Sequence, residues 1–195
     1  MTIDLNEAAV DTGDLIPDRT IAKVRLKIRP GGYDAPQFGA PGGIATHSAA
    51  TGSVYLDCEA TIIGGPYDRR KVWFMIGLFS SKGDNKWGAM GKTLARSILE
   101  SARSIRPDDM SPDAVQRRRI TSFHDLQDAE FVALISVEKG RDGGEDRNRI
   151  NRAITPDHKA YAAAMNSTMD GGANVANGAA TPSATATTTL SAQWT

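Results

Sequence analysis

Alternating apolar and polar positions along the chain predict five strands. From Thr20 to Arg29 apolar residues alternate with others, and four of the intervening positions are cationic, which predicts a strand with one apolar and one cationic face. Residues 53–63 alternate in the same way, and 70–80, 131–139 and 146–154 are three further predicted strands. Because Gly-Gly-Pro-Tyr-Asp separates 53–63 from 70–80, we expect these two strands to pair as a hairpin.

Between the third and fourth predicted strands the apolar period becomes helical. Apolar residues recur there every three or four positions, namely Met90, Leu94, Ile98, Ala102 and Ile105. Pro107 ends this pattern, and Ser111-Pro112 is a start signal for a second, short helix. The resulting β-β-β-α-β-β order is that of the OB-fold, a partly open five-stranded barrel. We therefore expect a mainly β protein, a β-barrel of OB type with one main helix, although other small barrels and α+β sheets share this order.

Composition separates a foldable domain from the two ends of the chain. Residues 1–18 are acidic with few apolar positions, and 165–195 consist almost entirely of Gly, Ala, Ser, Thr and Asn. Such segments bury too little apolar surface to offset the entropy lost on ordering. We therefore expect an acidic flexible arm over 1–18, one folded domain over 19–161 and a disordered tail over 165–195. Within the domain, the Gly- and Pro-rich stretch 30–52 is expected to be a mobile loop.

The net charge of zero conceals a segregation of charge. Residues 19–159 contain all 23 Lys and Arg but only 17 of the 23 Asp and Glu, whereas residues 1–18 carry five acids. A basic body favours a polyanionic ligand, although chance unevenness explains the same pattern.

Cys58 is the only cysteine, which excludes an internal disulfide. The absence of long apolar runs and of a signal-peptide pattern leads us to expect a cytoplasmic protein with no membrane partner.

The cationic face of the first predicted strand is one candidate binding surface. Its four charged side chains stand roughly 6–7 Å apart, a spacing similar to that of phosphates in an extended single strand. Binding by such a row would release counterions and depend strongly on salt. Asp57 and Glu59 lie on the polar face of the neighbouring predicted strand and could instead neutralise the cations.

Aromatic residues beside these cations are the second candidate feature. In 70–80 the alternation directs one apolar set inward, which leaves Lys71, Trp73, Met75 and Phe79 on the outer face near Tyr55. Bases stack on exposed rings while Lys and Arg hold phosphates, and each stacked base contributes roughly 1–3 kcal/mol. The alternative is that these rings pack under the helix or the loop 30–52.

Catalytic interpretations find weaker support. Gly91-Lys92-Thr93 matches the end of a P-loop, but Lys86 occupies the position of its first glycine and no apolar strand precedes it. The three histidines are isolated and lack the spacing of zinc ligands. Asp57 and Glu59 could belong to a metal-dependent nuclease, yet no further acid or lysine is suitably spaced. We therefore expect no enzymatic activity, no metal and no cofactor.

Four segments of the sequence together carry a resemblance to a known protein family. These are Gly-Ser-Val-Tyr-Leu-Asp-Cys-Glu, Gly-Pro-Tyr-x-x-Arg-Lys-Val-Trp, Asn-Lys-Trp-Gly before the helix, and Glu-Asp-Arg-Asn-Arg-Ile late in the chain, within about Leu15 to Tyr161. The chain thereby resembles a domain-of-unknown-function family regarded as OB-fold single-stranded-DNA-binding proteins. The resemblance implies a role in phage DNA replication or recombination, with a recombinase, an annealing protein or a nuclease as partner.

These observations lead to one main hypothesis, a non-catalytic protein that binds single-stranded DNA largely without sequence preference. The expected DNA-binding residues are Lys23, Arg25, Lys27, Arg29, Tyr55, Lys71, Trp73, Trp87, Arg147 and Arg149. The alternative is a structural or assembly component of a phage-like particle, and a metal-dependent nuclease ranks below it. A homo-oligomer is compatible with the sequence.

Overall fold

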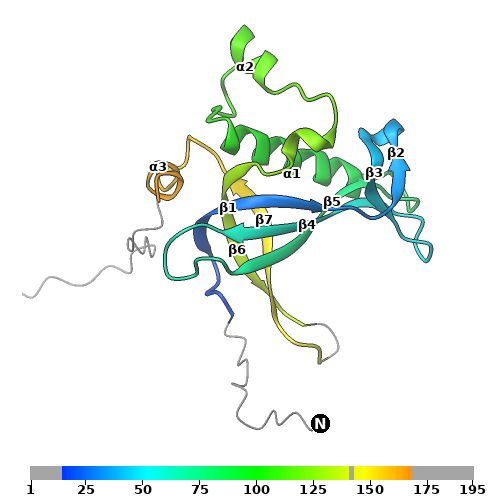
Figure 1. The fold of residues 1–195 in the computed structure, drawn as a ribbon, viewed down its shortest axis with the longest axis horizontal. Coiled ribbons are helices and arrows are strands. Elements are labelled where there is room, and N and C mark those ends of the chain that lie inside the picture. Colours follow the sequence, from blue (N-terminus) through cyan, green and yellow to red (C-terminus); the bar gives the residue numbers. More distant parts are fainter. Residues whose placement is uncertain (1–14, 141–142, 168–195) are drawn as a thin grey trace, which may run out of the picture.

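The computed structural model describes residues 15–140 and 143–167 of the chain (Figure 1). Most of the expected arm and tail, residues 1–14 and 168–195, therefore lie outside the described residues. The strands are β1 (Thr20–Arg29), β2 (Tyr33–Ala35), β3 (Ala40–His47), β4 (Val54–Ile62), β5 (Lys71–Phe79), β6 (Glu130–Glu138) and β7 (Arg147–Ile154). The helices are α1 (Lys86–Ala102), α2 (Pro112–Arg117) and α3 (Tyr161–Met165), and short 3-10 turns occupy Pro36–Phe38 and Phe123–Leu126.

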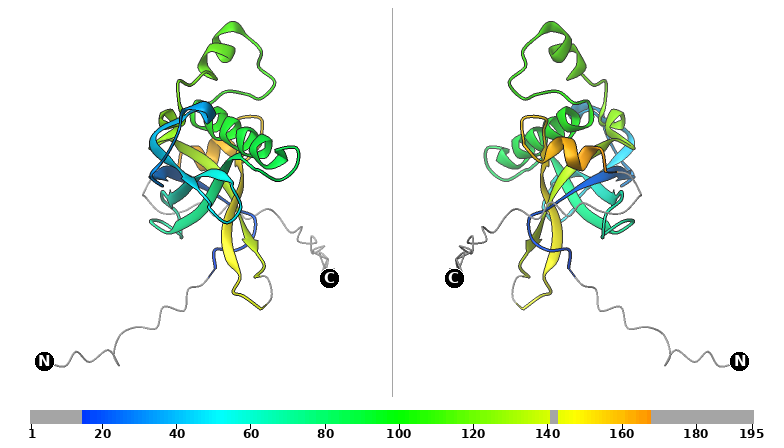
Figure 2. Two further views of the ribbon diagram at one scale, coloured as in Figure 1. Left: turned by 90° about the vertical axis from the view of Figure 1, so that its right-hand side faces the viewer. Right: turned by 90° about the vertical axis from the view of Figure 1, so that its left-hand side faces the viewer.

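The described residues form a mainly β protein in which seven antiparallel strands make an open sheet beside one main helix. The strand order is β2-β3-β4-β1-β6-β7, and β5 also pairs with β4. β1 pairs with β6 through its first half and with β4 through its second half. The predicted hairpin of β4 and β5 is confirmed. The α2 region and the tip of the β6–β7 hairpin project in opposite directions (Figure 2).

The core lies where the predicted apolar faces meet under α1. Every second residue of β4 is buried, and so are Val72, Phe74, Ile76 and Leu78 of β5, which confirms the predicted inward set. α1 contributes Ala95, Ile98 and Leu99 to the same core. Alternation thus identified the buried face of each of these strands because one face packs and the other is solvated.

The prediction that 30–52 is a mobile loop is wrong, since 11 of its 23 residues form strands β2 and β3 of the sheet. β2 and β3 pair with each other, and β3 continues the sheet by pairing with the start of β4. Ala35, Ala40 and Ala45 are completely buried in this part of the sheet. Phe38 stacks on Phe79 with ring centroids 5.2 Å apart. Small apolar residues let the segment pack closely, and a composition rich in Gly and Ala concealed that packing.

Both ends of the folded domain extend past the expected limits of 19 and 161. Ile16 is 1% exposed and exchanges two hydrogen bonds with Asn148: its amide donates to Oδ1 at 2.8 Å, and its carbonyl accepts from Nδ2 at 2.7 Å. Residues 15–18 are therefore part of the domain. At the other end Tyr161 begins α3 and donates a hydrogen bond of 2.7 Å to the Ser101 carbonyl, so α3 is attached to the end of α1.

α1 begins at Lys86, four residues before the first residue of its apolar stripe, and lies directly on β5. A Cβ atom added to Gly91 would stand 1.8 Å from the carbonyl oxygen of Gly77 in β5. Conversely, a Cβ on Gly77 would stand 2.7 Å from the Trp87 ring. Helix and strand can approach this closely only because both positions lack side chains.

Gly91→Ala should therefore destabilise the protein. Alanine in place of glycine in a helix normally gains up to about 1 kcal/mol, but forcing α1 away from β5 costs roughly 1–3 kcal/mol or more. We expect a net loss of about 2 kcal/mol in the free energy of unfolding, measured by urea denaturation. Thr93→Ala on the exposed side of α1 is the control and should change it by less than about 0.5 kcal/mol. A Gly91→Ala protein as stable as the wild type would contradict the close approach.

Candidate functional site

The outer face of β1, β4 and β5 carries charged and aromatic side chains in rows that cross the three strands. Residues paired across antiparallel strands share a face, so the register defines these rows. The rows are Arg25–Thr61–Lys71, Lys27–Glu59–Trp73 and Arg29–Asp57–Met75. Acidic residues of β4 therefore lie between the cations of β1 and the ring of Trp73 on β5.

Three of the four β1 cations are held in ion pairs. Lys23 and Arg25 both contact the carboxylate of Glu130 on β6, at 2.8 and 2.5 Å, and Arg29 lies 3.3 Å from Asp57. Among the described residues Lys27 has no ion pair. The competing interpretation of a charge-paired face thus holds for most of this strand, although Glu130 rather than Glu59 is the main acid.

A groove between β5 and β7 brings together four of the expected binding residues. It has a volume of about 370 Å³, and Lys71 and Trp73 of β5 and Arg147 and Arg149 of β7 line it. We call it the β5–β7 groove. The Trp73 residue is 53% exposed, which makes it the most exposed ring in this groove. A wide planar ring that is open to solvent, in a groove also lined by cations, can stack on another planar group.

Acidic side chains in the β5–β7 groove hold these cations in place. The Glu138 carboxylate accepts hydrogen bonds from Arg147 Nε and Arg149 Nη1, both at 3.0 Å, and these two partners lower its pKa. Lys71 lies 3.0 Å from Glu59. Four cationic and three acidic side chains line the groove, and Glu59 beside it is a fourth acid, so cations and acids are equal in number.

A second hollow of about 360 Å³ continues from the β5–β7 groove. Met75, which is 43% exposed, lines both. Tyr55, Trp87 and Lys82 line the second hollow, and the two rings meet edge to face with centroids 6.1 Å apart. Both rings are half-buried, and Trp87 also packs against Gly77, so they expose less surface than Trp73.

Three other aromatic rings are half-buried and stack on neighbouring rings. Phe79 stacks on Phe38, and Tyr33 stacks on His47 with ring centroids 5.0 Å apart. The Phe38–Phe79 contact attaches the segment that joins β1 to β4 to β5. Sequence reasoning missed Glu138 and Leu15, which also line the β5–β7 groove. The sequence signal for Glu138 was its position at the end of β6, in a hairpin whose other strand begins with Arg147. The register pairs these two residues.

Other chemical groups in the described residues add little to this site. The Cys58 thiol is completely buried, and desolvation raises its pKa, which disfavours the reactive thiolate. Residues 15–140 and 143–167 contain no group of three or more His, Cys, Asp or Glu side chains placed to hold a metal ion. No helix in this described part of the chain is long and apolar enough to cross a membrane.

Comparison with models of known protein families found no match, and a search of curated proteins found no significant match either. The fold and the β5–β7 groove therefore carry the functional argument.

Glu130→Gln should lower stability in a pH-dependent way. Lys23 and Arg25 hold the pKa of Glu130 below its usual value. The ion pairs stabilise the folded state above the pKa that Glu130 has in the unfolded chain, and this contribution is lost as pH falls through the lower folded-state pKa. We expect a cost of about 0.5–1 kcal/mol at pH 7 that disappears in acid.

Urea denaturation between pH 7 and pH 3 measures this difference. Glu145→Gln is the matched control, because Glu145 is exposed and has no ion pair among the described residues. A cost for Glu130→Gln that is the same at every pH would show that the charge of Glu130 contributes nothing.

Proposed function

We propose that this protein binds single-stranded DNA largely without sequence preference and catalyses no reaction. The observation that carries the proposal is the exposed ring of Trp73, which lines the β5–β7 groove together with Lys71, Arg147 and Arg149. Single-strand binders combine stacking rings with cations that contact phosphates, because every base has a flat face and every linkage has a charge.

The bound strand would run from the β5–β7 groove across Met75 to Tyr55 and Trp87. One base stacks on Trp73, and Arg147 and Arg149 exchange part of their contact with Glu138 for phosphate oxygens. Lys27 is the β1 cation best able to reach a phosphate, since the other three must first leave Glu130 or Asp57. Binding is consequently of moderate affinity and sensitive to salt.

An OB-fold is part of this proposal. If β2 and β3 are treated as an insertion after the first strand and the short helices are left out, the order of the remaining elements is β-β-β-α-β-β. OB-folds bind oligonucleotides on the face of their second and third strands. Here those strands are β4 and β5, which carry Tyr55 and Trp73.

The same proposal extends to the biological setting that the sequence resemblance implies. The single-stranded DNA would be that exposed during phage or prophage replication or recombination in the host cytoplasm, with a recombinase, an annealing protein or a nuclease as partner. The alternative is an assembly component of a phage-like particle. The ion pairs that neutralise most of β1 favour that alternative, because they leave fewer cations for a polyanion.

Trp73→Ala should weaken binding to oligo-dT about 5- to 100-fold, equivalent to losing one stacked base worth roughly 1–3 kcal/mol. Tryptophan fluorescence of the wild-type protein, titrated with oligo-dT at two salt concentrations, should be quenched, and more weakly at higher salt. Fluorescence anisotropy of a labelled oligo-dT gives the affinity of the variant. Trp73→Phe keeps a ring and is the control, with most of the affinity retained.

Two results would contradict the proposal. Shortening of the oligonucleotide in a parallel sample with magnesium would indicate a nuclease. No response to any nucleic acid would favour the assembly role.

Removal of residues 1–14 should tighten oligo-dT binding at low salt. This segment carries four acids and no Lys or Arg, and it joins the fold at Leu15, which lines the β5–β7 groove. A tethered acidic segment competes with DNA for the cations at a high effective concentration. Anisotropy titrations at about 50 mM and 300 mM salt should show the difference shrinking as salt screens it. An unchanged affinity at low salt would contradict the prediction that residues 1–14 compete with DNA.

A further inference from the structure

A second, larger groove lies between α1 and the segment that carries α2. It has a volume of about 580 Å³, within the range of sites that bind ligands and peptides. Apolar side chains from both segments line it, namely Ala95, Leu99, Met110, Val115, Ile120 and Phe123. We call it the α1–α2 groove. It shares no lining residue with the β5–β7 groove, and α2 projects away from the β6–β7 hairpin (Figure 2).

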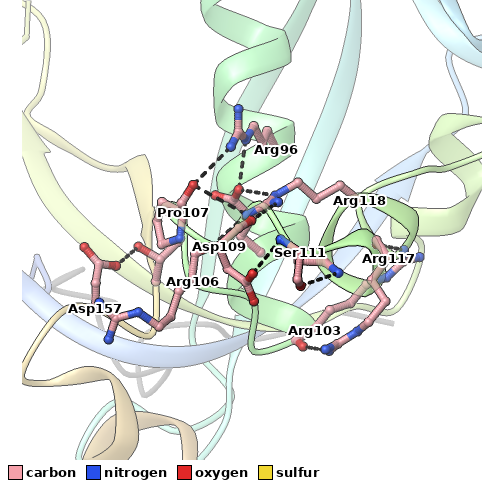
Figure 3. A network of polar contacts seen from close by, with 12 residues as sticks. Arg96, Arg103, Arg106, Pro107, Asp109, Ser111, Arg117, Arg118 and Asp157 are labelled. Atoms are coloured by element: carbon pink, nitrogen blue, oxygen red, sulfur yellow. Dashed lines mark hydrogen bonds and ion pairs between the residues drawn. The ribbon is translucent and has the colours of Figure 1, made fainter.

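An ion pair to a buried carboxylate holds the two walls of this groove together. Glu100 of α1 is 3% exposed, and its Oε1 accepts hydrogen bonds from Arg96 at 2.8 Å and from Arg118 at 2.7 Å. Arg118 also donates to the carbonyls of Arg106 and Asp109 (Figure 3). One guanidinium thus ties α2 to α1 and to the intervening turn.

Further bonds hold the rest of the α2 segment. Arg103 and Arg117 each donate a hydrogen bond to the other's carbonyl (Figure 3). The predicted helix start is confirmed, because the Ser111 hydroxyl accepts a hydrogen bond of 3.3 Å from the Ala114 amide. The groove is therefore preformed, which lowers the entropy that a ligand must lose on binding.

The charged side chains that line the α1–α2 groove are all cationic. Its lining includes four cationic side chains and no carboxylate. Arg96 and Arg118 are engaged by Glu100, whereas Lys92 and Arg119 are exposed and have no ion pair among the described residues. Met110 stands at the rim and is 72% exposed. An apolar floor bordered by unpaired cations matches a ligand with apolar anchors and negative charges.

We propose that the α1–α2 groove binds a short acidic segment of a protein partner, with two or three large apolar side chains in the groove and flanking carboxylates on Lys92 and Arg119. Exposed apolar surface rimmed by charge is typical of protein interaction sites. Flexible methionines such as Met110 adapt to such partners. A polynucleotide fits this floor less well, because it is lined by aliphatic side chains and Phe123 is buried.

The two parts of this chain outside the described residues are poorer occupants. Residues 168–195 have one acid, Asp170, so they lack the negative charge that the proposed ligand needs. Residues 1–14 have the charge, but they join the fold at Leu15 in the β5–β7 groove. The test below separates these occupants.

The probe is a fluorescein-labelled synthetic peptide of 14 residues with two Leu and one Phe spaced three and four positions apart and four Glu at the other faces. Anisotropy titration of the full chain should show saturable binding that weakens at least tenfold in Lys92→Glu/Arg119→Glu and several-fold in Met110→Ala. Lys159→Glu and Met90→Ala are matched controls, since both side chains are exposed outside the groove, and they should bind the peptide as the wild type does.

Three results would overturn the proposal. The first is no binding of the peptide, or equal binding of a version with Lys in place of Glu. The second is competition by oligo-dT that disappears in Trp73→Ala, which would place the peptide in the β5–β7 groove. The third is binding that tightens when residues 1–14 or 168–195 are deleted, which would assign the groove to the chain's own segment. Loss of oligo-dT binding alone would refute the DNA proposal and leave this one intact.

Discussion

The antiparallel register that joins β1, β4 and β5 decides where the charged and aromatic side chains of the outer sheet face lie. β4 pairs with both neighbours over the same residues, so Lys27, Glu59 and Trp73 fall in one row. A shift of one residue in either pairing would turn Trp73 inward or bury a charge. The buried alternate residues of β4 make that shift costly, and the outer face is therefore as well defined as the core.

Acidic residues of the sheet position its cations. Glu130 holds two cations on β1, and Glu138 holds two on β7. Surface ion pairs of this kind add little to stability, but they restrict the side chains to one region. A polyanion that replaces these carboxylates meets cations already gathered in place. The cost of displacing the acids would also limit the affinity for a polyanion, as expected for the proposed reversible binding of DNA.

α1 contributes residues to two of the described hollows: Trp87 lines the one next to the β5–β7 groove, and Lys92, Ala95 and Leu99 line the α1–α2 groove. Its start packs on β5 through Gly77 and Gly91, next to the hollow lined by Tyr55 and Trp87. Near its other end, Glu100 binds the arginines that hold the α2 segment. If both proposals hold, one rigid helix links a DNA site to a protein site without the two sharing residues, so each can be altered alone.

Alternation was sufficient to predict the ranges and inward faces of β1, β4 and β5, and the helical period predicted the main helix, because burial of one face imposes its period on the sequence. The ranges of β6 and β7 were also predicted, although β6 buries three residues in succession and does not alternate. Alternation also identified Trp73 as an outward ring. Composition was misleading for 30–52, where alanine and glycine permit close packing, and for Ile16, whose hydrogen bonds are to a residue 132 positions away. Contacts between segments distant in sequence decide three further features. They make Glu130 the partner of Lys23 and Arg25, bring Trp73 and Arg147 into one groove, and form the α1–α2 groove. Such contacts follow from strand order and helix packing, which the local pattern of a single chain does not encode.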